Sequence, residues 1–267
     1  MSRLRDVIEA ARARGERALV AYLTAGDPSF EVSLRVLLEA ARRGADIIEL
    51  GVPWSDPSAD GVAIQGGMLR ALAGGMRLGR SLELMRAFRR ESDVPVVLFG
   101  YFNPILSYGC ERLASDARAA GVDGLLVVDL PLDEADELRL PARAAGLDWV
   151  PLLAPTSTPA RIARAAEVAD GFVYYVSMTG VTGAALAPAL AEAEAKVAEL
   201  RQVLKQPIAV GFGVATPEDA RQVGGFADAV VVGSALVREI EQAVAAGRDP
   251  AAAVGDRVAG LKAALKG

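Results

Sequence analysis

Residues 207–237 read PIAVGFGVATPEDARQVGGFADAVVVGSALV, and this stretch decides the fold class. It contains two short apolar runs, at about 207–211 and 228–232, and a glycine-bearing turn follows each. Between them, Thr216 before Pro217 is a typical helix start, because threonine caps free N–H groups and proline suits the first helical position. The stretch therefore predicts strand, helix, strand and the start of another helix, the repeat of a parallel α/β sheet.

The same alternation extends over the whole chain. Strands are expected at about residues 19–24, 46–50, 95–99, 124–128, 148–153, 171–176, 207–211 and 228–232. This number of βα units in 267 residues favours a closed (β/α)8 TIM barrel, although the length alone would also fit two ordinary domains. Because no linker divides the chain, we expect a single (β/α)8-barrel catalytic domain over residues 1–267. An N-terminal helix before the first strand and an extra terminal helix near 250–265 would be additions to the barrel.

Composition excludes several classes of protein. The apolar fraction is 52%, which suits buried parallel strands and argues against disorder. The net charge of −5 gives no basic field, so neither nucleic acid nor a membrane surface is an expected partner. With Cys110 as the single cysteine and no histidine, an internal disulfide and the usual metal sites are excluded. Without an apolar signal segment, we expect a cytoplasmic protein.

Two carboxylates are expected at one rim of the barrel. Glu49 ends the strand at 46–50, and the loop GVPWSDPSADG that follows brings Asp60 to the same side. In such barrels the active site lies at the C-terminal ends of the strands. An unpaired carboxylate facing the helices would be costly, so we expect Glu49 to point into the barrel mouth. A structural ion pair is the alternative for Glu49.

Glycine-bearing turns follow the last two expected strands. Gly211 and Gly213 lie in AVGFGV, and Gly233 precedes Ser234 in VVVGSAL. Glycine permits close backbone approach, and a helix beginning at Ser234 would direct free N–H groups at an anion. Isolated glycines at strand ends are often only turn residues, but this is the recurrent phosphate site of the fold. The turns therefore predict a phosphate cradle that needs no lysine.

Missing residue types narrow the reaction class. The lysines, Lys196, Lys205, Lys262 and Lys266, avoid the catalytic ends of the expected strands, which disfavours a Schiff-base aldolase. A zinc aldolase would lack its histidine ligands, although carboxylates could still hold magnesium. A carbon–carbon lyase remains open if the substrate supplies its own electron sink. After the strand at 171–176, the loop MTGVTGAALAPA could close over a ligand or could be merely flexible.

Several segments, taken together, carry a family resemblance. They are AYLTAGDP, DIIELGVPWSDPSADG with Gln65, YFNPIL, VVDLPLDE, LLAPTSTPARI, YYVSMTGVTG, VGFGV and VVGSALV. Over essentially its full length the chain resembles the tryptophan synthase alpha chain family. The resemblance implies retro-aldol cleavage of indole-3-glycerol phosphate to indole and glyceraldehyde 3-phosphate in tryptophan biosynthesis. Because an indole ring protonated at C3 accepts electrons, carboxyl groups alone could serve as acid and base.

The resemblance also implies roles for individual residues. Glu49 is expected to be the catalytic acid-base residue, and Asp60 the catalytic carboxylate that binds and polarises the indole N–H. Thr182 is expected to close onto Asp60. The implied substrate-binding residues are Tyr22, Tyr101, Tyr174, Thr182, Gly183, Gly211, Phe212, Gly213, Gly233 and Ser234.

A partner follows from the same resemblance. The family's alpha chain pairs with a beta chain, expected as an alpha2beta2 heterotetramer, and passes indole to it through a tunnel. No cofactor is expected in this chain, because pyridoxal phosphate would belong to the beta chain alone. The residues on loops that face the beta chain in that family are Pro53, Asp56, Asn103 and Pro104, although loop geometry explains them equally well.

Some positions depart from the family pattern, namely Trp54, Val62, Gly66 and Gly67. Each glycine costs about 1 kcal/mol in a helix relative to alanine, so this region is expected to be more mobile than in relatives. The departures put the strength of coupling to a beta chain in doubt rather than the chemistry.

Other functions remain open. A stand-alone lyase that releases free indole would share every catalytic residue. A catalytically weak regulatory subunit is also possible, but the presence of both Glu49 and Asp60 argues against it. Another phosphate-binding barrel, such as an isomerase of the same pathway, would have to work without a strand-end lysine or histidine.

Overall fold

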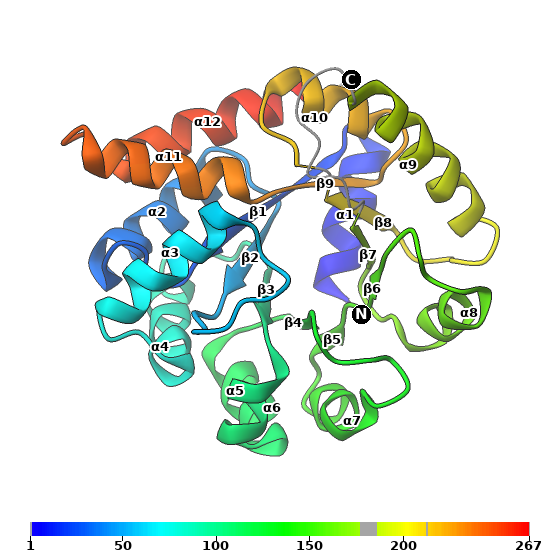
Figure 1. Cartoon of the computed structure of the whole chain (residues 1–267), viewed down its shortest axis with the longest axis horizontal. Coiled ribbons are helices and arrows are strands. Elements are labelled where there is room, and N and C mark those ends of the chain that lie inside the picture. Colours follow the sequence, from blue (N-terminus) through cyan, green and yellow to red (C-terminus); the bar gives the residue numbers. More distant parts are fainter. Residues whose placement is uncertain (1, 177–185, 212, 267) are drawn as a thin grey trace.

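The computed structural model describes residues 2–176, 186–211 and 213–266. The strands are β1 Ala18–Thr24, β2 Ile47–Gly51, β3 Val96–Gly100, β4 Gly124–Val127, β5 Asp148–Trp149, β6 Leu152–Leu153, β7 Val173–Val176, β8 Ile208–Gly211 and β9 Ala229–Val232. The helices are α1 Arg3–Ala13, α2 Phe30–Arg42, α3 Val62–Ala73, α4 Leu78–Arg89, α5 Phe102–Tyr108, α6 Cys110–Ala120, α7 Asp136–Ala144, α8 Pro159–Val168, α9 Leu186–Leu200, α10 Pro217–Gly224, α11 Ser234–Ala245 and α12 Pro250–Ala264. Figure 1 shows helices arranged as a ring around the strands.

The strands form one parallel sheet in the order β5-β4-β3-β2-β1-β9-β8-β7-β6. β5 and β6 stand at opposite ends of this order, yet only Val150 and Pro151 separate them in the chain. The two ends of the sheet therefore meet, and the sheet closes into a barrel. This confirms the predicted (β/α)8 TIM barrel.

The strand expected at 148–153 is divided, which corrects the expectation of one continuous run. β5 pairs with β4 and β6 pairs with β7, and Pro151 lies at the break because it has no N–H to donate. Backbone hydrogen bonds bridge the gap: Val150 N–H donates to the Leu125 carbonyl and Tyr174 N–H to the Pro151 carbonyl, both at 3.0 Å. The two pieces therefore act as one barrel strand.

Alternation along the strands builds two apolar layers. In β2, Ile48 and Leu50 face the layer between strands and helices, whereas Ile47 faces the barrel interior. Glu49 follows Ile47 by two residues, so the same period points its side chain inward. The interior below it is filled by Leu4, Ile8, Val20, Ile47, Val97, Leu126, Val150, Phe172, Ala209 and Ala229. The carboxyl group of Glu49 therefore lies above an apolar floor.

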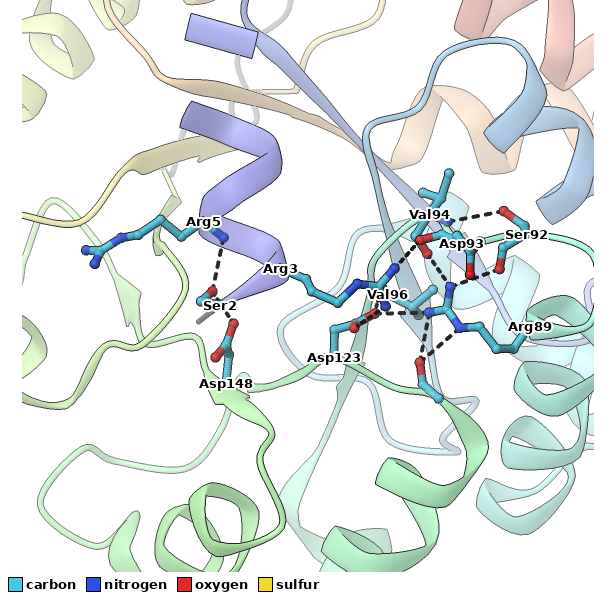
Figure 2. Close-up of polar contacts among 11 residues, drawn as sticks. Ser2, Arg3, Arg5, Arg89, Ser92, Asp93, Val94, Val96, Asp123 and Asp148 are labelled. Carbon is cyan, nitrogen blue, oxygen red and sulfur yellow. Dashed lines mark hydrogen bonds and ion pairs between the residues drawn. The ribbon is translucent and has the colours of Figure 1, made fainter. Parts of the chain in front are cut away.

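Helix α1 closes the N-terminal end of the barrel, and its apolar face is buried there. Figure 2 shows the polar contacts around it: Arg3 and Arg89 both donate to Asp123, at 2.7 and 3.0 Å, and Ser2 donates to Asp148. Since this end is sealed by apolar packing and by ion pairs, the opening of the barrel lies at the C-terminal ends of the strands.

The expected additions and helix starts are confirmed. α1 precedes the first strand, and α12 is the extra terminal helix. Thr158 and Thr216 cap α8 and α10, where each hydroxyl accepts a hydrogen bond from the backbone N–H three residues later. Within the described parts of the chain, no helix is long and apolar enough to cross a membrane.

Candidate active site

A cavity of about 600 Å³ opens at the C-terminal ends of the strands. It is lined by Tyr22, Glu49, Ser58, Ala59, Asp60, Gly61, Ile64, Phe99, Val128, Leu152, Ala154, Tyr174, Val176, Gly211, Gly213, Val214, Val231, Gly233 and Ser234. Both expected carboxylates and both glycine turns therefore share one cavity. A hollow of similar volume, about 620 Å³, is lined by residues of α2, residues 91–94 before β3 and the start of α12, and none of its lining residues lies at the C-terminal end of a strand.

Glu49 lies beside Tyr22 in the register of β2 and β1, and it is only 1% exposed. Neither carboxyl oxygen has a hydrogen-bond partner among the described residues. Burial without a counter-ion disfavours the charged form, and it raises the pKa of Glu49 from 4.5 to about 8. A group that titrates there can both give and take a proton near neutral pH. The alternative of a structural ion pair for Glu49 finds no partner among the described residues.

Asp60 ends the loop between β2 and α3, and its backbone and side chain are both held. Tyr101 Oη donates to Asp60 Oδ2 at 2.7 Å, while the Ala59 N–H donates to the same tyrosine oxygen at 3.1 Å. Gln65 Nε2 donates to the Asp60 carbonyl at 2.8 Å. Burial raises the pKa of Asp60, and the hydrogen bond from Tyr101 partly offsets that rise. Tyr101 therefore belongs to the site through Asp60 rather than through the cavity wall.

The two glycine turns meet the cavity from β8 and β9. Gly213 has a φ of +63°, a conformation that favours glycine, and no atom of the described residues would lie within 4 Å of a Cβ added there. Gly233 is the N-cap of α11, which begins at Ser234 as expected. The free N–H groups of this helix start and the open space at Gly213 suit an anion.

Two tyrosines lie over glycines of the neighbouring strands. A Cβ at Gly51 would lie 2.3 Å from Tyr22 Oη, and a Cβ at Gly211 would lie 2.3 Å from Tyr174 Oη. Both rings are buried, and Tyr22 packs edge-on against Phe99 with ring centroids 5.1 Å apart. Glycine is therefore needed at both positions, because any larger residue would clash with the tyrosine hydroxyl beside it.

The apolar wall of the cavity was not predicted from the sequence. It consists of Ile64, Phe99, Val128, Leu152, Val176 and Val231. All but Ile64 lie at or near the C-terminal ends of strands. Because active sites of such barrels lie at these ends, inward-facing apolar residues there could have been predicted to line the cavity. A flat aromatic ligand of moderate size would find apolar contacts here and Asp60 at the edge.

Residues assigned to a partner surface differ in exposure. Asp56 and Asn103 are exposed, Pro104 is half-buried, and Pro53 is buried within the chain. Their contact with a beta chain stays a prediction.

Other expected site residues lie outside the described part of the chain, namely Thr182, Gly183 and Phe212. Among the described residues, no group of three or more His, Cys, Asp or Glu side chains could hold a metal ion.

Comparison with known proteins points to one family. The family model described as tryptophan synthase alpha chain matches residues 8–266. A tryptophan synthase alpha chain of Citrifermentans bemidjiense is 54% identical over 242 residues, covering 91% of this chain and 90% of the relative. One of Geobacter sp. strain M21 is 53% identical over the same lengths.

Solved structures agree with the sequence comparison. Tryptophan synthase subunit alpha of Legionella pneumophila superposes with a TM-score of 0.92 at 38% identity, covering 99% of this chain and 98% of that one. A chain of tryptophan synthase from M. tuberculosis gives 0.89 at 34% identity, covering 100% and 99%. The family model, the curated relatives and the solved structures agree: the chain belongs to the tryptophan synthase alpha chain family.

Proposed function

We propose that this enzyme subunit cleaves indole-3-glycerol phosphate to indole and glyceraldehyde 3-phosphate, with residues 1–267 acting as one catalytic domain. The observation that carries the proposal is the buried Glu49, whose pKa is raised to about 8 in a cavity that also contains Asp60 and the glycine turns. An acid-base group, an ionisable partner and a phosphate cradle are the parts that this cleavage requires.

Glu49 acts first as an acid and then as a base. Its carboxyl proton goes to C3 of the indole ring, which becomes a cationic indoleninium. The Glu49 carboxylate then takes the proton of the hydroxyl on the adjoining glycerol carbon. As that oxygen forms the aldehyde, the carbon–carbon bond breaks and its electron pair returns to the ring. Glu49 ends the cycle protonated, so no other proton donor is consumed.

Asp60 acts by charge. Its carboxylate accepts a hydrogen bond from the indole N–H and stabilises the positive charge that develops on the ring. The hydrogen bond from Tyr101 favours the ionised form that this role needs, against the effect of burial. The apolar wall that includes Phe99 and Leu152 excludes water from the ring and strengthens this interaction.

The phosphate of the substrate is assigned to the turns after β8 and β9. Backbone N–H groups at Gly213, Gly233 and Ser234 and the N-terminus of α11 supply the donors. No lysine lines the described cavity, so these dipoles carry the binding. Tyr22 and Tyr174 line the same cavity as the carboxylates and the glycine turns.

Family membership implies a beta chain as partner. We assign the assembly as alpha2beta2 in the cytoplasm, with pyridoxal phosphate held only by beta and with indole passing to it. Asp56 lies on the loop after β2 and Asn103 in the first turn of α5, just after β3; both are exposed and follow the C-terminal ends of their strands, which suits such a contact.

The test is an assay of purified chain with indole-3-glycerol phosphate. Indole and glyceraldehyde 3-phosphate are measured with and without a cognate beta chain. The proposal predicts both products in equal amounts and faster turnover when beta is present. If indole is absent under both conditions, the proposed reaction is wrong. Full turnover without any response to beta would instead contradict the proposed coupling.

A further inference from the structure

Asp27 is a buried carboxylate that the proposed chemistry does not use. It lies in the loop after β1 and is 0% exposed. Arg70 of α3 donates to both of its oxygens, from Nε to Oδ1 at 2.8 Å and from Nη2 to Oδ2 at 2.9 Å. The third nitrogen, Nη1, donates to Glu241 of α11 at 3.2 Å. A single planar guanidinium therefore joins the loop after β1 to α3 and α11.

Close packing restrains α3 at the same place. An added Cβ at Gly67 would lie 2.9 Å from Asp27 Oδ2 and 2.9 Å from Val237 Cγ1 of α11. Figure 1 shows α3, in cyan, beside α11, in orange. The helix tolerates this glycine, despite its unfavourable helix propensity, because a side chain would push α3 away from both neighbours. This packing restrains α3 at Gly67, and the greater mobility expected from Gly66 and Gly67 stays a prediction.

Both helices carry groups of the cavity at their N-terminal ends. α3 begins at Val62, two residues after Asp60, and the side chain of Gln65 in its first turn donates to the Asp60 carbonyl. α11 follows Gly233, and the Val237 N–H donates to the Gly233 carbonyl at 3.1 Å. Arg70 therefore ties the helix that carries the carboxylate to the buried Asp27 in the loop after β1, while its contact with the exposed Glu241 of α11 is peripheral.

We propose that Arg70 is a positioning residue: its bidentate pair with Asp27 fixes α3 so that Asp60 reaches the indole N–H of a substrate whose phosphate is held at α11. This inference rests on the proposed function. Misplacing a reacting group by about 1 Å can cost about 100-fold in rate. Arg70→Met therefore lowers kcat about 100-fold, while KM changes little because the phosphate contacts remain.

Arg70→Met is compared with a conservative variant and with a matched control. Arg70→Lys keeps the charge that the buried Asp27 needs, but one ammonium cannot reproduce the two parallel hydrogen bonds. It folds and loses at least about tenfold in kcat. Glu241→Gln alters only the ion pair between Arg70 Nη1 and Glu241, whose side chain is 57% exposed. This variant leaves kcat unchanged. If Arg70→Met fails to fold, Arg70→Lys decides the question alone.

A binding experiment separates positioning from general stabilisation. Indole can donate its N–H to Asp60, whereas 1-methylindole cannot. By calorimetric titration, Arg70→Lys weakens indole binding about tenfold and leaves 1-methylindole binding as in the wild type. Wild-type kcat in folded Arg70→Lys, equal weakening of both ligands, or an equal loss in Glu241→Gln overturns the proposal. A wild-type chain that makes no indole refutes the proposed function instead, so the two failures are distinguishable.

Discussion

Replacing Glu49 by glutamine is predicted to stabilise the chain increasingly as the pH rises. Burial raises the pKa of this carboxyl from 4.5 to about 8, so the folded chain keeps a proton that the unfolded chain has released. The stability contributed by neutral Glu49 is complete below pH 4.5 and is lost as the pH rises to about 8. At about 1.36 kcal/mol per pH unit, the rise in pKa from 4.5 to about 8 corresponds to a loss of about 5 kcal/mol in the free energy of unfolding. Glutamine is uncharged and escapes this loss.

The assay is urea denaturation of both proteins at pH values from about 5 to about 9, compared as the difference in free energy of unfolding. That difference should grow in favour of Glu49→Gln by several kcal/mol and level off above pH 8. Glu83→Gln, on the exposed side of α4, serves as the control and should show no such trend. A difference that stays constant over the range would mean that Glu49 ionises normally in the folded chain, and the argument for its acid role would fail.

Three further substitutions test the surroundings of the two carboxylates. Asp60→Asn is expected to lower turnover about 100- to 1000-fold, because loss of a preorganised electrostatic group costs about 2.7 to 4 kcal/mol. Steady-state kinetics on indole-3-glycerol phosphate check this, and near-normal turnover would remove Asp60 from the mechanism. Tyr101→Phe removes the hydroxyl that holds Asp60 at 2.7 Å, so kcat should fall at least about tenfold, and an unchanged kcat would show that the contact is dispensable. Gly211→Ala would place a Cβ 2.3 Å from Tyr174 Oη and displace that ring, so KM for the substrate should rise. Titration with inorganic phosphate measures the same effect on the cradle, and wild-type affinity would contradict it.

Much of the fold could be predicted, because its signals are local. Apolar runs that alternate with helical segments predicted the barrel. Helices α8 and α10 begin where the capping residues Thr158 and Thr216 predict. The inward direction of Glu49 followed from the cost of burying its charge against helices. The break at Pro151 was missed, although a proline in an expected strand is itself a signal.

The contacts that complete the site could not be predicted, because they join distant segments. The hydrogen bond from Tyr101 to Asp60 spans 41 residues, and the pair of Arg70 with Asp27 spans 43. Each depends on how loops pack once the barrel has closed, and no periodicity in the sequence encodes that geometry. The apolar wall is hidden for a related reason, since Phe99 and Leu152 resemble the other apolar residues of their strands until the register is known.

Single-turnover cleavage of indole-3-glycerol phosphate by Glu49→Gln tests the central claim most directly. Enzyme is used in excess over substrate, after circular dichroism has shown that the variant is folded and a titration has shown that it binds the substrate. The wild type serves as the reference for the amplitude of indole formation. The account predicts that Glu49→Gln binds substrate and forms no indole, whereas near-normal indole formation would show that the proton comes from another group and would contradict it.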